Sequence, residues 1–244
     1  MEQSAATKKF NFIIQAKGGV GKSFLTYLIA VKHEEDDSRT FIDVDSSTKT
    51  STAQLRFLAE KEQRLAEIDL LDSYRKIARD RLFDSIQQLS SLNNEVFYLD
   101  FGAPESEQVP ALLTIDLNQD ELKQFEQYLG VEFLFHVVVA GGTAYTSCVD
   151  YLMKIYKAVG NVFPIMVWIN TNTFQNFPQQ QEECLAVAKK CRMSVEHFGD
   201  IEPNTDLASK IITNIERGEG SSGILAAGWF AKTKMDKLVK TITI

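Results

Sequence analysis

The sequence contains, close to its start, the stretch Ala16-Lys17-Gly18-Gly19-Val20-Gly21-Lys22-Ser23, which decides what fold the chain can adopt. An apolar run at Phe10–Gln15 precedes this stretch and is typical of a buried strand. After it, Gly21–Glu34 places apolar residues at helical spacing. A strand, a glycine-rich loop and a helix in this order predict a phosphate-binding loop, with Ala16 standing where the strict pattern has glycine.

The chemistry of this loop favours a nucleotide. Glycines let backbone amides turn inward without a Cβ in the way, and the amides lie at a helix N-terminus, where the helix dipole favours an anion. Lys22 can reach the β- and γ-phosphates of ATP, and the Ser23 hydroxyl can ligate Mg²⁺. A chance glycine-rich turn is the alternative, and the flanking strand and helix argue against it.

The remaining pattern alternates strands with helices. Further strands are expected at Thr40–Val44, Val96–Leu99, Phe133–Ala140, Phe163–Ile169 and Val195–Phe198. Helices are expected from Asn118, where Asn118-Gln-Asp-Glu121 indicates a helix start, and at Thr143–Val159, Pro178–Cys191 and Thr205–Glu216. This alternation predicts the α/β class: a three-layer P-loop NTPase fold, with a mostly parallel sheet flanked by helices, in one domain over residues 1–244.

Two segments are harder to place. The charged stretch Thr52–Leu92 is expected to form two helices broken near Asp69. Residues Gly218–Gly223 are expected to form a Gly/Ser loop.

Composition narrows the class of protein. The net charge of -7 repels nucleic acid and anionic lipid, so contact with either needs a local basic patch. Three widely spaced cysteines indicate neither a disulfide framework nor a metal site. Met1–Lys9 lacks the apolar core of a signal peptide, and no apolar run approaches the roughly 20 residues that span a bilayer. A cytoplasmic location is therefore expected.

The loop resembles the deviant Walker A motif of the ParA/MinD/Soj family of ATPases, because a lysine stands at its start as well as near its end. Four further segments resemble that family in the expected order. They are Asp43-Val44-Asp45 (switch I), Phe97–Pro104 (Walker B and switch II), Trp168-Ile169-Asn170 (adenine recognition) and Gly199–Asn204 (the late loop beside the base).

The resemblance implies roles at the phosphates. Lys17 would cross the interface of a dimer and touch phosphate in the partner subunit, where two triphosphates meeting face to face need extra positive charge. Lys22 would hold the β- and γ-phosphates, within a loop formed by Gly18, Gly19, Val20 and Gly21.

Three aspartates receive roles in the same way. Asp45 would orient the attacking water, and Asp43 and Asp100 would join Ser23 in holding magnesium. An aspartate at the end of a strand can also merely cap the next helix, which is the alternative for Asp43 and Asp100.

The base-binding residues implied by the resemblance are Asn170, which would hydrogen-bond adenine, and Pro203, which would lie against its ring. Phe24, directly after the loop, is included among the nucleotide-binding residues. Asn170 could instead be a turn residue and Pro203 simple loop punctuation.

Departures from the family pattern leave the hydrolysis rate and the partner open, but not nucleotide binding. Ser46-Ser47-Thr48 replaces the Pro-Gln-Gly of many ParA proteins, and the Walker B segment lacks the common double proline. Together with the long stretch before Val96, with Val137–Gly142 and with Val167–Asn170, these features resemble those of ParA-like ATPases encoded on plasmids near stability and conjugative-transfer functions.

The function implied is a dimeric switch ATPase that binds ATP/ADP with Mg²⁺, hydrolyses ATP slowly and responds to a partner protein, in plasmid or DNA partitioning, stability or positioning. A MinD-like membrane-associated positioning ATPase, a P-loop small-molecule kinase or ligase, and an adaptor that no longer hydrolyses ATP are the alternatives.

Two basic regions are candidates for a cargo surface. Nonspecific DNA binding would use Arg75, Lys76, Arg79 and Arg81, or Lys189, Lys190 and Arg192, although either set can be a solvated helix face. Ile224–Ile244 mixes lysines with Trp229 and Phe230, and so could lie on lipid or could dock on the domain as a terminal helix.

Overall fold

The computed structural model describes residues 7–46, 49–61, 63–72, 74, 78–202 and 204–244. Within this part of the chain, strands form a seven-stranded sheet in the order β3-β2-β4-β1-β5-β6-β7, and every pairing is parallel. The strands are β1 (Lys8–Ile14), β2 (Arg39–Val44), β3 (Leu65–Glu67), β4 (Val96–Phe101), β5 (Val131–Val139), β6 (Ile165–Asn170) and β7 (Ser194–Phe198). The predicted parallel α/β sheet is confirmed.

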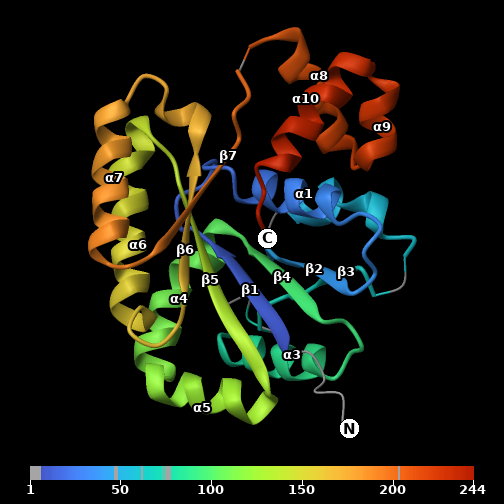
Figure 1. Cartoon of the computed structure of the whole chain (residues 1–244). Helices are drawn as coiled ribbons and strands as arrows, with labels where there is room; N and C mark the ends of the chain where they lie inside the picture. The colour runs from blue at the N-terminus through green and yellow to red at the C-terminus, as the bar shows by residue number, and fades with distance from the viewer. Residues whose placement is uncertain (1–6, 47–48, 62, 73, 75–77, 203) are drawn as a thin grey trace, which may run out of the picture.

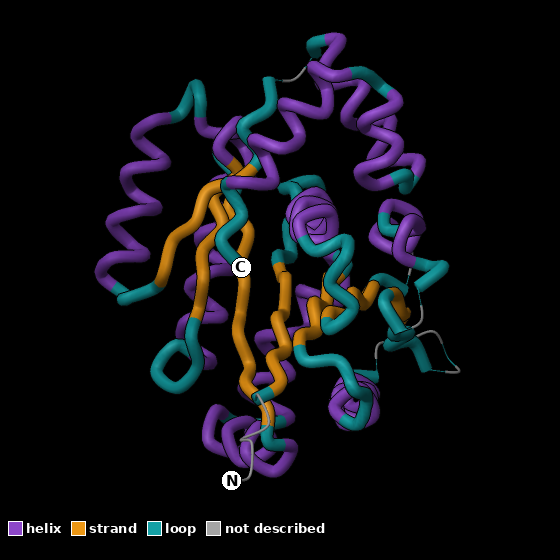
Figure 2. The backbone as a smooth tube through the Cα atoms, turned by 45° about the vertical axis from the view of Figure 1, so that its right-hand side comes forward, coloured by secondary structure: helices purple, strands orange, loops and turns teal. Residues whose placement is uncertain are grey.

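Helices cover both faces of this sheet (Figure 2). The α-helices are α1 (Lys22–Lys32), α2 (Thr50–Gln54), α3 (Asp80–Ser90), α4 (Ala103–Ala111), α5 (Gln119–Leu129), α6 (Tyr145–Val159), α7 (Pro178–Lys190), α8 (Asp206–Arg217), α9 (Gly220–Ala226) and α10 (Trp229–Lys240). Short helical turns, η1 to η4, occupy Arg56–Leu58, Leu112–Asp116, Gly142–Ala144 and Thr171–Phe174. Figure 1 shows α6 and α7 on one side of the sheet, and α1 with α8, α9 and α10 on the other.

The predicted helical stretch Thr52–Leu92 is largely wrong. Among the residues of that stretch that the structure describes, only α2 and α3 are α-helical, and β3 lies between them, adding an edge strand beside β2. Backbone bonds from Phe41 N to Arg64 O and from Ile68 N to Asp43 O flank this strand at 2.9 Å each. Pairing with an exposed sheet edge overrides the local helix preference of a charged segment, since edge pairing satisfies backbone groups that the segment alone cannot.

The other boundaries follow local signals more closely. The predicted start at Asn118 is confirmed, because Asn118 and Glu121 form a capping box at the beginning of α5. The predicted loop Gly218–Gly223 is only partly right, since α9 begins at Gly220. Gly218 and Gly220 both have positive φ, at 61° and 62°, so glycine permits the turn that separates α8 from α9.

The C-terminal segment forms a docked helix, the second of the two alternatives predicted for it. Helix α10 buries Ala231, Met235 and Leu238 and packs against α1, α8 and α9. Trp229 and Phe230, at its start, are 77% and 66% exposed. No helix among the described residues is long and apolar enough to cross a membrane.

A buried polar network joins the central strands. His136 of β5 is fully buried, its Nε2 lies 2.8 Å from Asn11 Oδ1, and Trp168 Nε1 donates to His136 Nδ1 at 2.9 Å. Because Nδ1 accepts, Nε2 carries the proton and donates to Asn11. Burial lowers the pKa of His136 from 6.5 to about 3, so the imidazole is neutral in the folded chain.

This histidine is expected to make stability depend on pH. Its folded pKa lies below the unfolded value, so its contribution to the free energy of unfolding is complete above pH 6.5 and is lost as the pH falls toward 3. The loss approaches about 1.4 kcal/mol per pH unit. Urea unfolding at pH 7.5, 5.5 and 4.5 measures it, with His136→Gln as the comparison, because glutamine keeps one donor and one acceptor. Identical pH dependence in the two proteins would contradict the assignment.

Candidate nucleotide site

The loop between β1 and α1 has the backbone that its glycines permit. Gly19 and Gly21 have φ values of 75° and 105°, a region that residues with a Cβ rarely adopt. Gly21 is the N-cap residue of α1, so the helix begins directly at Lys22. The loop therefore ends at a helix N-terminus, which is where backbone amides and the helix dipole attract an anion.

A cavity of about 400 Å³ opens over this loop, at the carboxyl ends of β1, β2 and β4. Its walls are formed by the loop, by the ends of β2 and β4, and by the first residues of α2 and α4. The lining residues are Gly18 to Phe24, Asp43, Asp45, Thr50 and Asp100 to Pro104. Its size lies within the range of about 300–1,000 Å³ that is usual for small-molecule sites.

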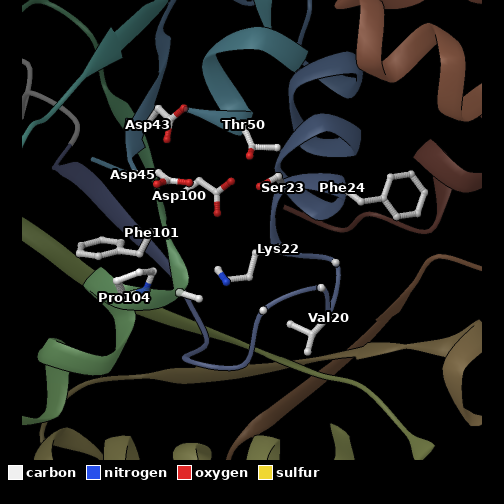
Figure 3. Close-up of a pocket in the computed structure, with 15 residues that line it drawn as sticks. Val20, Lys22, Ser23, Phe24, Asp43, Asp45, Thr50, Asp100, Phe101 and Pro104 are labelled. Atoms are coloured by element: carbon white, nitrogen blue, oxygen red, sulfur yellow. The ribbon is translucent and has the colours of Figure 1, made fainter. Parts of the chain in front are cut away.

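Lys22 faces three carboxylates across the cavity. Figure 3 shows the Lys22 ammonium on the side of the loop and Asp43, Asp45 and Asp100 on the opposite side. The Lys22 side chain is largely buried and its Nζ donates to Gln15 O at 2.9 Å. Burial lowers the pKa of Lys22, and the charges of Asp100 and Asp45 act in the opposite direction.

The buried carboxylates are held by hydroxyls and an amide of α2. Thr52 donates to Asp43 Oδ2 from its backbone N at 2.7 Å and from Oγ1 at 3.0 Å, and Ser51 Oγ donates to Asp100 Oδ2. Burial raises the pKa of Asp43 to about 6 and also raises the pKa of Asp100. Asp100 Oδ1 is buried and has no hydrogen-bond partner among the described residues.

Sequence reasoning missed Thr50 on the cavity wall, and it also missed residues that contact this wall or the segment next to it. Thr50, Ser51 and Thr52 belong to a run rich in hydroxyl side chains after Asp45, and that run was a usable signal. Glu105 is 2% exposed and its Oε1 accepts from Ser46 N at 3.1 Å. A glutamate in the first turn of a helix is common, so the sequence offered no sign that this one is buried.

Lys17 lies outside the cavity walls. Its side chain is exposed, and its backbone N donates to Gln15 Oε1 at 3.2 Å. Gln15 is itself fully buried, with Nε2 donating to Val138 O at 2.8 Å. The start of the loop is thus anchored to the centre of the sheet, while the Lys17 ammonium is presented to solvent.

Asn170 is next to the loop but is not part of the cavity wall. At the end of β6, its Nδ2 donates to Val20 O at 3.0 Å. A Cβ at Gly21 would lie 2.8 Å from Asn170 Nδ2, and one at Gly199 would lie 2.7 Å from Oδ1, so two glycines make room for this amide. Asn170 therefore contacts the loop from the side of β6.

Phe24, which the sequence analysis includes among the nucleotide-binding residues, lies on the cavity wall. Its ring points away from the carboxylates in Figure 3 and lies 6.2 Å, centroid to centroid, from Phe198. The prediction for Pro203 falls outside the described residues.

The predicted basic patches are only partly available. Arg75 and Lys76 lie outside the described residues, whereas Arg79 pairs with Asp116 and Arg81 donates to Leu71 O. In the second set, Lys189, Lys190 and Arg192 are all exposed, at the end of α7 and just beyond it. That set is therefore the more accessible candidate for contact with an anionic partner such as DNA.

Comparisons with known proteins place the fold. No family model matches the chain. Protein TraL of Escherichia coli is 26% identical over 171 residues, which are 66% of this chain and 63% of TraL. The chain therefore spans less than two thirds of that relative's length.

Solved structures match over nearly the whole chain. The MinD cell division protein of Aquifex aeolicus superposes with a TM-score of 0.54 at 14% identity, covering 96% of this chain and 95% of MinD. A plasmid partition protein of Borrelia burgdorferi gives a TM-score of 0.52 at 15% identity, covering 86% and 96%. The chain thus has the α/β P-loop fold of the ParA/MinD proteins, as its motifs predict.

Proposed function

We propose that the chain is a ParA-type switch ATPase that binds Mg·ATP, hydrolyses it slowly and closes as a homodimer around two nucleotides. One observation carries the proposal: a glycine-rich loop at a helix N-terminus, with a buried lysine that faces three aspartates across a cavity of about 400 Å³. We take residues 1–244 to act as a single nucleotide-binding domain.

The loop is proposed to hold the phosphates. Amides of Gly18 to Gly21 surround them, and Lys22 exchanges its bond with Gln15 O for charge-assisted bonds to the β- and γ-phosphate oxygens. Lys17 is exposed, so its ammonium is available to a nucleotide in a second subunit. In this arrangement each nucleotide contacts both subunits, which makes dimerisation depend on ATP.

The donor set fits magnesium. Asp100 Oδ1 is buried without a hydrogen-bond partner among the described residues, and hard oxygen ligands are those that Mg²⁺ prefers. Within the same residues, no cluster of three acidic, histidine or cysteine side chains could hold a metal alone. Mg²⁺ is therefore proposed to enter with the phosphates, next to Ser23, Asp43 and Asp100, where it would offset phosphate charge.

Asp45 is proposed to orient the attacking water. It follows β2, is half-buried, and lines the cavity beside Asp100. On the base side, Asn170 and Phe24, with Pro203, are proposed to contact adenine. Asn170 would exchange its contact with Val20 O for the base, and the Phe24 ring borders the same side of the loop.

The cargo is proposed to be a partner protein or DNA in partitioning, stability or positioning. Both solved relatives described above support this class, since one is a plasmid partition protein and the other a cell division protein. Nonspecific DNA contact would use the exposed Lys189, Lys190 and Arg192 and would weaken steeply with salt. A cytoplasmic location accords with this role.

Lys17→Ala is expected to abolish dimerisation by ATP, because the variant removes the exposed charge that reaches the second nucleotide. Light scattering after size exclusion, with ADP and then with a nonhydrolysable ATP analogue, measures the mass of the complex. Wild type and Lys157→Ala, which removes an exposed lysine of α6, should both become dimers with the analogue. A Lys17→Ala protein that dimerises like wild type would refute the proposed sandwich dimer.

A further inference from the structure

Glu105 is a buried acid for which the assignments above give no role. It lies in the first turn of α4 and is 2% exposed, and its Oε2 has no hydrogen-bond partner among the described residues. Burying a carboxyl group with one oxygen unsatisfied costs free energy, so such a residue calls for a physical reason.

The contacts of Glu105 reach the segment that carries Asp45. Ser46 N donates to Glu105 Oε1 at 3.1 Å, and Ser46 directly follows Asp45. A Cβ at Gly102 would lie 2.3 Å from Glu105 Oε2 and 3.0 Å from Asp45 Cγ. Both carboxyl groups therefore pack against the same glycine, and only a residue without a side chain leaves room for them there.

This geometry connects two parts of the phosphate end of the site. Gly102 and Glu105 follow β4 and Asp100, whereas Asp45 and Ser46 follow β2. Gly102 N also donates to Val44 O at 3.0 Å, so a backbone bond joins the same two segments. The Glu105 carboxyl adds a side-chain bond two residues further along the β2 segment.

We propose that Glu105 is a positioning residue: it accepts a hydrogen bond from the Ser46 amide and so holds Asp45 in place against the start of α4. The proposal rests on the proposed function, in which Asp45 orients the attacking water. In this proposal, the positioning of Asp45 depends on the length of the Glu105 side chain, which brings Oε1 to Ser46 N, and not on the charge of Glu105.

Two conservative variants separate the effect of side-chain length from the effect of charge. Glu105→Asp keeps the charge but shortens the side chain by one methylene, so it withdraws from Ser46 N. Glu105→Gln keeps the length and the acceptor. Glu107→Ala, an exposed glutamate two residues along α4, is the matched control.

Steady-state hydrolysis of Mg·ATP is the first measurement. Glu105→Asp is expected to lower kcat about 10-fold with KM changed less than about twofold, because the lost bond orients the catalytic segment without touching the nucleotide. Glu105→Gln should keep at least about a third of the wild-type kcat, and Glu107→Ala should match wild type. A Glu105→Gln protein as slow as Glu105→Asp, or an unchanged Glu105→Asp, overturns the proposal.

Amide exchange of Ser46, followed by NMR in nucleotide-free protein, is the second measurement. The amide should be protected in wild type and Glu105→Gln and should exchange about 10-fold faster in Glu105→Asp. This measurement needs no ATP, so failure of the proposed function is recognised separately: wild type would then neither bind nor hydrolyse ATP, whatever the exchange rates. Equal exchange in all three proteins would show that the Ser46 contact does not hold the segment.

Discussion

Lys22→Ala is expected to lower the affinity of the chain for Mg·ATP by about 100-fold. The ammonium is buried at the end of the loop and donates to Gln15 O, from where it can turn to the phosphates. Hydrogen bonds to a charged group contribute about 1.5–3 kcal/mol each, and a loss of about 3 kcal/mol corresponds to about 100-fold in affinity. Competition with a fluorescent ATP analogue measures the change.

The control for this prediction is Lys157→Ala, which removes the same side chain from an exposed position on α6. It should bind Mg·ATP like wild type. Circular dichroism and urea unfolding establish that Lys22→Ala is folded, so that a loss of affinity belongs to the site. A folded Lys22→Ala protein that binds Mg·ATP with wild-type affinity would show that Lys22 does not bind the phosphates.

Asp45→Asn is expected to lower kcat for ATP hydrolysis by about 100-fold while leaving the affinity for Mg·ATP within a few-fold of wild type. The expected loss is at the lower end of the about 10²- to 10⁴-fold that a positioned acid or base contributes, because asparagine keeps the size of the side chain but loses the charge that orients the water. Single-turnover hydrolysis of labelled ATP measures the rate. The variant should accumulate as the ATP-bound dimer.

Asp150→Asn, on an exposed position of α6, is the matched control and should hydrolyse ATP at the wild-type rate. The same assay tests whether the chain is an adaptor without hydrolysis, because wild type would then show no turnover. Equal rates in wild type and Asp45→Asn would place the water-orienting group elsewhere.

The parts of the fold that the sequence predicts are those with a strong local signal. The apolar run Phe10–Gln15 corresponds to β1, which spans Lys8–Ile14, and the Asn118 cap begins α5 as expected. Strand β3 has three residues, none of them fully buried, so no apolar run identifies it. Its existence depends on pairing with β2, which is information from tertiary structure.

The candidate site also has one part that the sequence predicts and another part that depends on tertiary packing. Lys22, Ser23, Asp43, Asp45 and Asp100 line one cavity, because the loop and the ends of parallel strands meet at the same edge of the sheet. The order and spacing of the motifs were enough to predict that these residues lie together, although their roles stay predictions.

The burial of Glu105 could not be predicted, and neither could the contacts from α2 to Asp43 and Asp100. Each depends on how α2 and α4 pack over the strand ends, and their sequences do not encode a packing partner. The contact of Asn170 with the loop carbonyl of Val20 likewise links residues 150 positions apart.

Titration calorimetry with Mg·ATP and Mg·ADP on the folded wild-type chain tests the central claim most directly. The account predicts saturable heat with one nucleotide per chain, and loss of that heat in Lys22→Ala. Absence of heat with both nucleotides in a chain shown to be folded would contradict the account, since the loop would then not be a nucleotide site.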